Sequence, residues 1–252
     1  MKHRAILILA VMGAALVLSS GVALAALNTI ECKTERRCIG TDARDLMKGT
    51  DARNKMYGKG AGDILKGFGE WDLLYGGGGS DKLYGGAGTD DIFPGRGNDA
   101  VLDGGGSVDA YYFETNDWGD DTITDGDTGN RVLFLSSIST DLIIFLVSNP
   151  REHQVLNPAG STVNWDGDVI EDVINYGTGD DTIYGDDAAN TIISLQGVDN
   201  DTIYGGEGNE YIDVFDGGGG DYVNCGENAR DRDFVRRDSG DRVVNCEDKN
   251  PL

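Results

Sequence analysis

The stretch YGGGGSDKLYGGAGTDDIF, residues 75–93, contains the pattern Gly-Gly-x-Gly-x-Asp twice, nine residues apart. Glycine has no Cβ, so it adopts positive φ at low cost and allows the backbone to turn tightly. Such a turn directs carbonyl oxygens inward, and the closing residue, Asp81 or Asp90, adds a carboxylate. Oxygen ligands of both kinds suit a hard cation such as Ca²⁺. A single copy would fit an acidic hairpin turn equally well, so the number of copies decides the interpretation.

A nine-residue repeat extends from this stretch in both directions. Seven units follow one another without insertion from residue 40 onward, and an extra residue at 103 then shifts the frame. The sixth position reads Asp45, Asn54, Asp63, Asp72, Asp81, Asp90 and Asp99, and the eighth reads Met47, Met56, Leu65, Leu74, Leu83, Ile92 and Val101. Looser units place Asp109 and Asp121 at the sixth position, and a second array has Asp181, Asn190, Asp201, Glu210 and Asp221 there. A fixed period of this kind predicts a solenoid.

These repeats resemble the RTX, or haemolysin-type calcium-binding, family, whose unit is G-G-x-G-x-D-x-U-x. Residues 76–84 and 85–93 match every fixed position of that unit. The segments DLIIFL (141–146) and VIEDVINYGTGDDTIYG (169–185) also resemble the stretch that precedes the repeats in serralysin-type proteases. The resemblance implies an all-β fold, a parallel β-roll in which two units form one coil and calcium lies between stacked turns. Aspartates eighteen residues apart would then share one edge.

The resemblance also implies a set of calcium ligands. They are the sixth-position aspartates and the turn glycines, namely Asp45, Asp63, Asp72, Asp81, Asp90, Asp99, Asp109, Asp121, Asp181, Asp201, Asp221, Gly77, Gly79, Gly86 and Gly88. Stacked parallel strands lie about 4.8 Å apart, and two carboxylates at that spacing repel each other by roughly 1–3.5 kcal/mol. A divalent cation between them turns the repulsion into attraction, so we expect folding to depend on calcium.

The order of these patterns predicts six segments. Residues 1–25 read as a signal peptide, with basic residues at 2 and 4, an apolar core and a cleavable Ala-Leu-Ala at 23–25. An uncleaved membrane anchor is the alternative, because residues 5–25 just reach spanning length. The further segments are an N-terminal disulfide segment at 26–39, a first β-roll at 40–133, a non-repetitive β insertion at 134–175, a second β-roll at 176–224 and a C-terminal disulfide cap at 225–252.

Four cysteines flank the repeats and none lies within them. In an exported protein they predict two disulfides. Closeness in sequence favours Cys32–Cys38 and Cys225–Cys246 among the three possible pairings. Zinc binding is the alternative, but the spacing contains no C-x₂-C pair.

Composition and missing motifs bear on function. The formal net charge of −23 becomes −25 when residues 1–25, with Lys2 and Arg4, are removed. This excess argues against nucleic acid and anionic membranes as partners. His153 would be the single histidine left, and the H-E-x-x-H, G-x-S-x-G and P-loop motifs are missing. We therefore expect a secreted, calcium-binding protein that is not an enzyme, with no membrane span after cleavage.

Its expected role is at a surface, in a matrix or in adhesion, with an extracellular polysaccharide or a cell-surface molecule as partner. One alternative is a calcium-dependent polysaccharide lyase, which would need a basic side chain such as Arg96 or Arg131 beside a calcium ion. Another is an accessory module of a secreted hydrolase. Tyrosines 75, 84, 184 and 204 at the ninth position predict either a binding surface or aromatic stacking on the outer strand faces.

Overall fold

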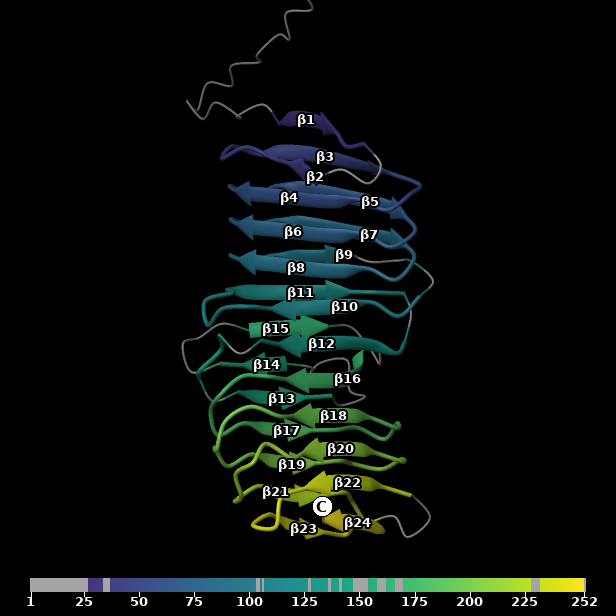
Figure 1. The fold of residues 1–252 in the computed structure, drawn as a ribbon. Coiled ribbons are helices and arrows are strands. Elements are labelled where there is room, and N and C mark those ends of the chain that lie inside the picture. The colour runs from purple at the N-terminus through teal and green to yellow at the C-terminus, as the bar shows by residue number, and fades with distance from the viewer. Residues whose placement is uncertain are drawn as a thin grey trace, which may run out of the picture.

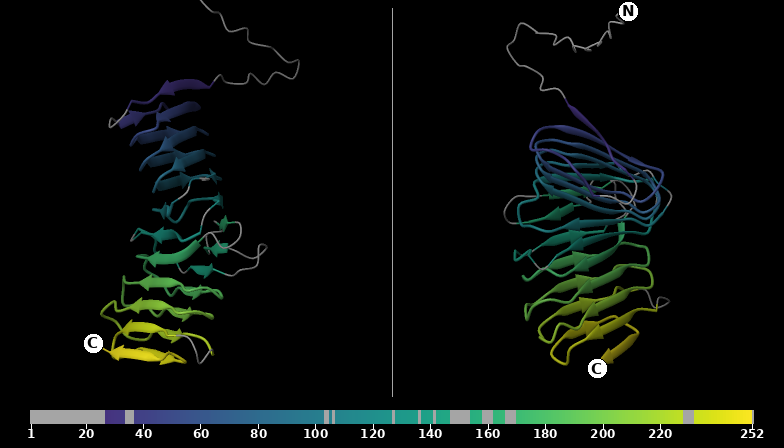
Figure 2. Two further views of the ribbon diagram at one scale, coloured as in Figure 1. Left: turned by 90° about the vertical axis from the view of Figure 1, so that its right-hand side faces the viewer. Right: turned by 45° about the horizontal axis from the view of Figure 1, so that its top comes forward.

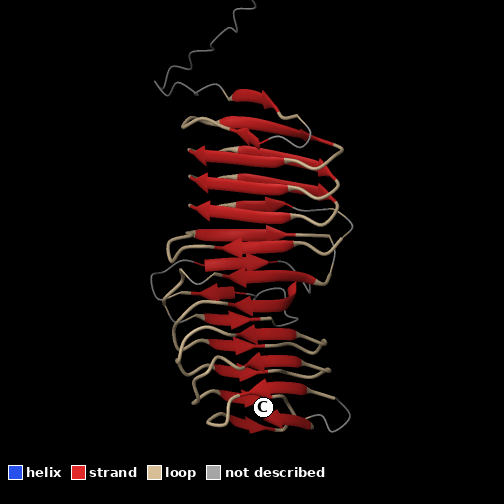
Figure 3. Cartoon of the chain, in the orientation of Figure 1, coloured by secondary structure: helices blue, strands red, loops and turns tan. Residues whose placement is uncertain are grey.

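The computed structural model describes residues 27–33, 37–102, 105, 107–126, 128–135, 137–140, 142–146, 154–157, 162–165, 170–227 and 232–251. The expected signal segment and His153 lie outside these residues. All regular secondary structure in the described part of the chain is β-strand (Figure 3). Within those ranges, no helix has the length and hydropathy needed to cross a membrane.

The strands form two long sheets that make up the opposite walls of a solenoid (Figure 1). In spatial order the first sheet contains β1 (Asn28–Glu31), β3 (Asp45–Thr50), β5 (Ile64–Gly69), β7 (Lys82–Ala87), β9 (Ala100–Leu102), β11 (Asp120–Thr124), β15 (Thr162–Trp165), β14 (Gln154–Leu156), β13 (Ile143–Phe145), β17 (Thr182–Tyr184), β19 (Thr202–Tyr204), β21 (Tyr222–Asn224) and β23 (Arg242–Val244). The second contains β2 (Arg37–Ile39), β4 (Lys55–Gly60), β6 (Leu73–Gly78), β8 (Asp91–Arg96), β10 (Ala110–Phe113), β12 (Asn130–Phe134), β16 (Ile170–Asn175), β18 (Thr191–Ser194), β20 (Tyr211–Val214), β22 (Phe234–Arg237) and β24 (Asp248–Pro251).

Successive strands alternate between the two sheets, so each pair of repeats makes one coil. Neighbours within a sheet are parallel and eighteen residues apart through the strict array, as in the pairing of Leu65 with Leu83. In the right-hand view of Figure 2, which is tilted so that the N-terminal coils come forward, the solenoid is a stack of flattened loops. The expected parallel β-roll is therefore confirmed.

A ladder of apolar side chains fills the narrow interior between the sheets. The eighth-position residues predicted from the period are all fully buried, and the ladder continues through Ile123 and Val132 into Val173, Ile183 and Ile203 of the second array. Side chains alternate between the two faces of a strand, so the seventh and ninth positions face outward. Each coil thus contributes one apolar residue per wall to a continuous core.

The segment between the arrays joins the same solenoid. Strands β13 and β15 extend the first sheet, and β14 pairs with both of them in antiparallel orientation. In the second sheet, β12 pairs directly with β16. Here the core becomes aromatic, because buried Phe113, Trp118 and Phe134 pack together with ring centroids 5.5–5.9 Å apart.

Both predicted disulfides are present, and each closes one end of the solenoid. Cys32 is bonded to Cys38 beside the first coil, and Cys225 is bonded to Cys246 in the last coils. No described cysteine is free, which leaves none of these four thiols for zinc. Terminal coils have open strand edges, so covalent closure at both ends suits this architecture.

Aromatic residues at the ninth position stack along the outside of the second sheet. Tyr57, Tyr75, Phe93 and Tyr112 follow one another with centroids 4.2–4.9 Å apart. The guanidinium of Arg37 covers the outer face of Tyr57. Because neighbouring rings cover each other's faces, this column supports the interpretation as stacking between coils. In the second array Tyr184 and Tyr204 stack in the same way, 4.9 Å apart.

One turn residue predicts a stabilising substitution. Phe68 has φ +91°, whereas the residue paired with it on the next coil is Gly86, with φ +106°. The Phe68 side chain is half exposed, so its packing offsets little of the left-handed strain. We expect Phe68→Gly to raise the free energy of unfolding by about 1 kcal/mol. Urea denaturation at saturating calcium would measure this gain. Phe68→Ala retains a Cβ and is the matched control; an equal gain in both variants would contradict the argument.

Candidate metal sites

Sixth-position carboxylates form a ladder along each edge of the solenoid. On the edge that leads into the first sheet, Oδ1 of Asp81 accepts the backbone N–H of Asp63 at 2.6 Å, and Oδ1 of Asp99 accepts that of Asp81 at 2.8 Å. The other edge repeats the pattern, since Oδ1 of Asp90 accepts the N–H of Asp72 at 2.7 Å. Each aspartate therefore binds the coil before it, and the residues that share an edge are those predicted from the period.

The second carboxylate oxygen, Oδ2, has no hydrogen-bond donor in four aspartates of the first-sheet edge. Asp63, Asp81, Asp99 and Asp121 are at most 3% exposed. Their Oδ2 atoms are buried and accept no hydrogen bond. A buried carboxylate oxygen without a donor is costly. A cation bound to a column of such oxygens would satisfy them.

Burial disfavours the charged form of these carboxylates. Desolvation raises the pKa of Asp81 to about 6, of Asp99 to about 7 and of Asp121 to about 9, and the neighbouring aspartate in the column raises each one further. The backbone hydrogen bond to Oδ1 lowers the pKa but does not offset the burial. The column therefore lacks positive charge, which a divalent ion would supply.

Glycines at the second and fourth positions allow successive turns to stack closely. A Cβ on Gly77 would lie 2.3 Å from the carbonyl oxygen of Lys59, and one on Gly79 would lie 2.4 Å from that of Ala61. On the other edge the corresponding distances are 2.4 Å from Gly86 to Phe68 and 2.1 Å from Gly88 to Glu70. Carbonyl oxygens of one turn therefore face the next turn at the glycines expected to contribute ligands.

The described residues contain no group of three or more His, Cys, Asp or Glu side chains placed to hold a metal. A calcium site here would therefore combine carboxylate oxygens with backbone carbonyl oxygens. The residues fit Ca²⁺, which accepts six to eight oxygen ligands, including backbone carbonyls, in flexible geometry.

The two turns of the first coil are built differently. Both have the sequence Gly-Thr-Asp-Ala-Arg followed by Asp45 or Asn54. Oδ2 of Asp45 accepts the N–H of Thr41 at 2.5 Å and its hydroxyl at 3.0 Å. Oδ1 of Asn54 accepts the N–H of Thr50 at 2.7 Å. In both turns a threonine therefore donates a hydrogen bond to the side-chain oxygen of the sixth-position residue. Asp45 thus has a donor to its Oδ2 atom, unlike Asp63 and Asp81.

The second array also provides donors to its carboxylates. Asp181 and Asp201 continue the ladder, because Oδ1 of Asp201 accepts the N–H of Asp181 at 2.9 Å. Their Oδ2 atoms are occupied, however. Asn175 donates from Nδ2 to Asp181, and Ser194 donates its hydroxyl to Asp201 at 2.5 Å. The sequence interpretation missed both donors. The sequence does contain a signal for them, because Asn175 and Ser194 stand at the ends of β16 and β18, where the first array has a glycine.

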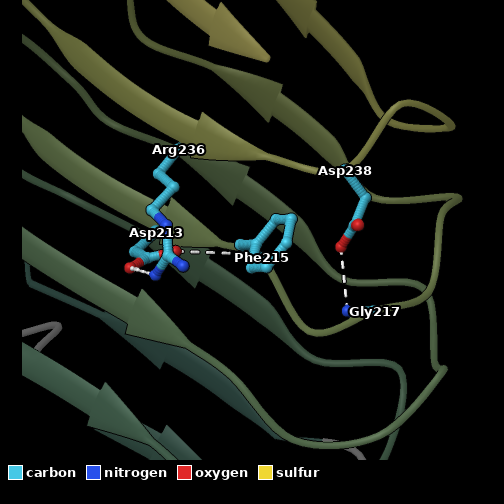
Figure 4. Close-up of polar contacts among 5 residues, drawn as sticks. All are labelled: Asp213, Phe215, Gly217, Arg236 and Asp238. Atoms are coloured by element: carbon cyan, nitrogen blue, oxygen red, sulfur yellow. Dashed lines mark hydrogen bonds and ion pairs between the residues drawn. The ribbon is translucent and has the colours of Figure 1, made fainter. Parts of the chain in front are cut away.

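Near the C-terminal end of the solenoid, a basic side chain and a backbone N–H contact two acidic side chains (Figure 4). Asp213 is buried and forms an ion pair with Arg236 at 3.0 Å, and the guanidinium of Arg236 also lies over the ring of Phe215. Asp238 accepts the N–H of Gly217 at 2.9 Å. Asp213 and Asp238 therefore interact with groups of the protein itself.

Arg96, which the lyase alternative would need, lies at the end of β8. With Tyr75, Phe93, Tyr112 and Glu114 it lines a groove of about 240 Å³. The groove lies beside the aromatic column on the outer face of the second sheet, while the orphaned carboxylate oxygens are buried inside the edge. Arg131 lies on β12, where it pairs with Ala110 and Asp172 of the neighbouring strands.

A family model described as "RTX calcium-binding nonapeptide repeat (4 copies)" matches residues 66–101 and 171–200. No curated protein matches the chain.

Proposed function

Because repeats of this chain match the RTX calcium-binding nonapeptide model, we propose that it is a secreted protein whose calcium ions are structural and whose role is at a surface, in a matrix or in adhesion. The repeats bind calcium. In this proposal the protein is not an enzyme, and calcium holds the coils together. Its partner is an extracellular polysaccharide or a cell-surface molecule.

One observation carries the structural role for calcium. The buried Oδ2 atoms of Asp63, Asp81, Asp99 and Asp121 form a column without donors. Calcium at these oxygens would offset the desolvation of the carboxylates and link each turn to the next. A solenoid is stabilised by contacts between neighbouring coils, so metal binding at the edges is coupled directly to folding.

Two features support export. Both disulfides join cysteines near the ends of the solenoid, and disulfides persist in oxidising compartments. Residues 1–25 have the composition of a cleavable signal peptide. Extracellular calcium would then saturate sites of the modest affinity that is usual for extracellular modules, about 0.1–1 mM.

Calorimetric titration of residues 26–252 with calcium tests the proposal. We expect several calcium ions to bind in the range of about 0.1–1 mM, with magnesium a poor substitute because it demands tighter octahedral geometry. Far-UV circular dichroism should gain β signal over the same range. A chain that shows no heat of calcium binding well above this range, with an unchanged β spectrum in chelator, would rule out the proposed function.

A further inference from the structure

The first-sheet edge contains equivalent carboxylates in both arrays. Oδ1 of Asp81 and Oδ1 of Asp201 have the same task, since each accepts the backbone N–H of the preceding aspartate in its column. All of these side chains are at least nine-tenths buried. Any difference in their demand for a cation must therefore come from what surrounds Oδ2.

In the first array, a glycine faces Oδ2. It is the inward-facing residue two positions after the apolar ladder residue of the second sheet, Gly58 before Asp63 and Gly76 before Asp81. A Cβ at either glycine would lie 2.6 Å from the Oδ2 atom of that aspartate. The glycine leaves no room for a donor side chain, and Oδ2 of both aspartates accepts no hydrogen bond.

In the second array, polar side chains occupy the same position. Asn175 follows ladder residue Val173 by two positions, and Ser194 follows Ile192; the two polar residues are paired in register on β16 and β18. Both are buried. The two-residue insertion after β18 lengthens the turn from Ser194 to Asp201 and makes room for the larger side chain.

These side chains form a short hydrogen-bond chain. Asn175 donates from Nδ2 to Oδ2 of Asp181 and, at 3.3 Å, to Oγ of Ser194. Ser194 then donates its hydroxyl to Oδ2 of Asp201 at 2.5 Å. Every proton in the chain has an acceptor. The chain ends at the next coil, because Val214 follows its ladder residue Ile212 by two positions and provides no donor toward Asp221.

We infer that Asn175 and Ser194 replace calcium at Asp181 and Asp201, so that this edge of the second array is stable without the ion while the first array requires it. The inference rests on the proposed function, because it assumes that the orphaned oxygens of the first array bind calcium. It divides one continuous solenoid into a calcium-dependent part, β5 to β11, and a calcium-independent part, β16 to β19.

Hydrogen exchange measured by mass spectrometry on residues 26–252 tests the division. In excess chelator, we expect amides of β5, β7 and β9 to lose protection by at least tenfold while amides of β17 and β19 keep theirs. Equal loss in both arrays, in a chain that binds calcium by calorimetry, would overturn the inference and leave the proposed function intact. A chain that binds no calcium would contradict the proposed function itself.

A variant tests the role of the hydroxyl. Ser194→Gly restores the glycine of the first array and removes the donor to Asp201. We expect β19 to lose protection in chelator and to regain it at saturating calcium. Thr191→Ala, on the same strand with its side chain facing outward, is the matched control and should behave as the unmodified chain. If protection of β19 in chelator is unchanged, or if calcium does not restore a lost protection, the inference that the Ser194 hydroxyl replaces calcium at Asp201 is wrong.

Discussion

Replacement of Asp81 by alanine is expected to destabilise the calcium-loaded protein by about 3–5 kcal/mol, because the change breaks a buried charged network. The carboxylate has two tasks. Oδ1 accepts the buried N–H of Asp63 at 2.6 Å, and Oδ2 is an orphaned acceptor at a proposed calcium site. Alanine leaves the N–H without an acceptor and removes a charged ligand from the middle of the column. Thermal denaturation at fixed free calcium, together with calorimetry, would measure both losses.

Two variants separate these tasks. Asp81→Asn keeps Oδ1 as an acceptor but removes the charge, so it should weaken calcium binding and yet be at least as stable as the unmodified chain in chelator. Asn54→Ala removes a single acceptor for the partly buried N–H of Thr50, at an expected cost of about 1 kcal/mol. Equal effects of Asp81→Ala and Asn54→Ala would show that the column does not bind calcium.

Replacement of Trp118 by alanine is expected to lower the free energy of unfolding by about 3–5 kcal/mol. The ring is fully buried and packs against Phe113 and Phe134 beside the non-repetitive segment. Alanine would leave a cavity that a stack of strands held on both sides cannot close. Urea denaturation at saturating calcium gives the change in stability.

Phenylalanine at the same position is the matched control. Nε1 of Trp118 is buried and makes no hydrogen bond, so Trp118→Phe removes a costly polar group together with part of the ring. We expect the loss in this variant to stay below about 1.5 kcal/mol. A loss as large as that of Trp118→Ala would mean that the shape of the indole, rather than the filled volume, stabilises this region.

The regular part of the fold could be predicted because its sequence signal repeats. One apolar residue and one aspartate recur every nine residues, and the same two positions form the core ladder and the edge ladder in the structure. Residues 134–175 lack that period. Nothing in their composition indicates that β14 runs antiparallel between β13 and β15, because that pairing depends on contacts between strands distant in sequence.

The exceptions at the edges were harder to predict. Asp45 matches the repeat as well as Asp63 does, yet Thr41 occupies its oxygens. Likewise, Asp201 matches the repeat, but the hydroxyl of Ser194, seven residues earlier, satisfies it. A motif fixes which residue points into the edge. Whether that residue needs a metal depends on which side chain replaces a glycine of the motif, as Thr41 and Ser194 do, and the sequence does not show that these side chains reach the carboxylate.

The edge ladder also gives the solenoid a direction. Asp63, Asp81 and Asp99 each accept the N–H of the aspartate in the coil before, so each of those coils is completed by the one that follows. Truncation from the C-terminus would remove the acceptor of the last such N–H, whereas truncation from the N-terminus would remove the donor to a carboxylate oxygen. The last coils, closed by Cys225–Cys246, therefore provide hydrogen-bond acceptors for the coil that precedes them. Synthesis delivers the chain in the opposite order, so the ladder can be completed only after the C-terminal end has been made.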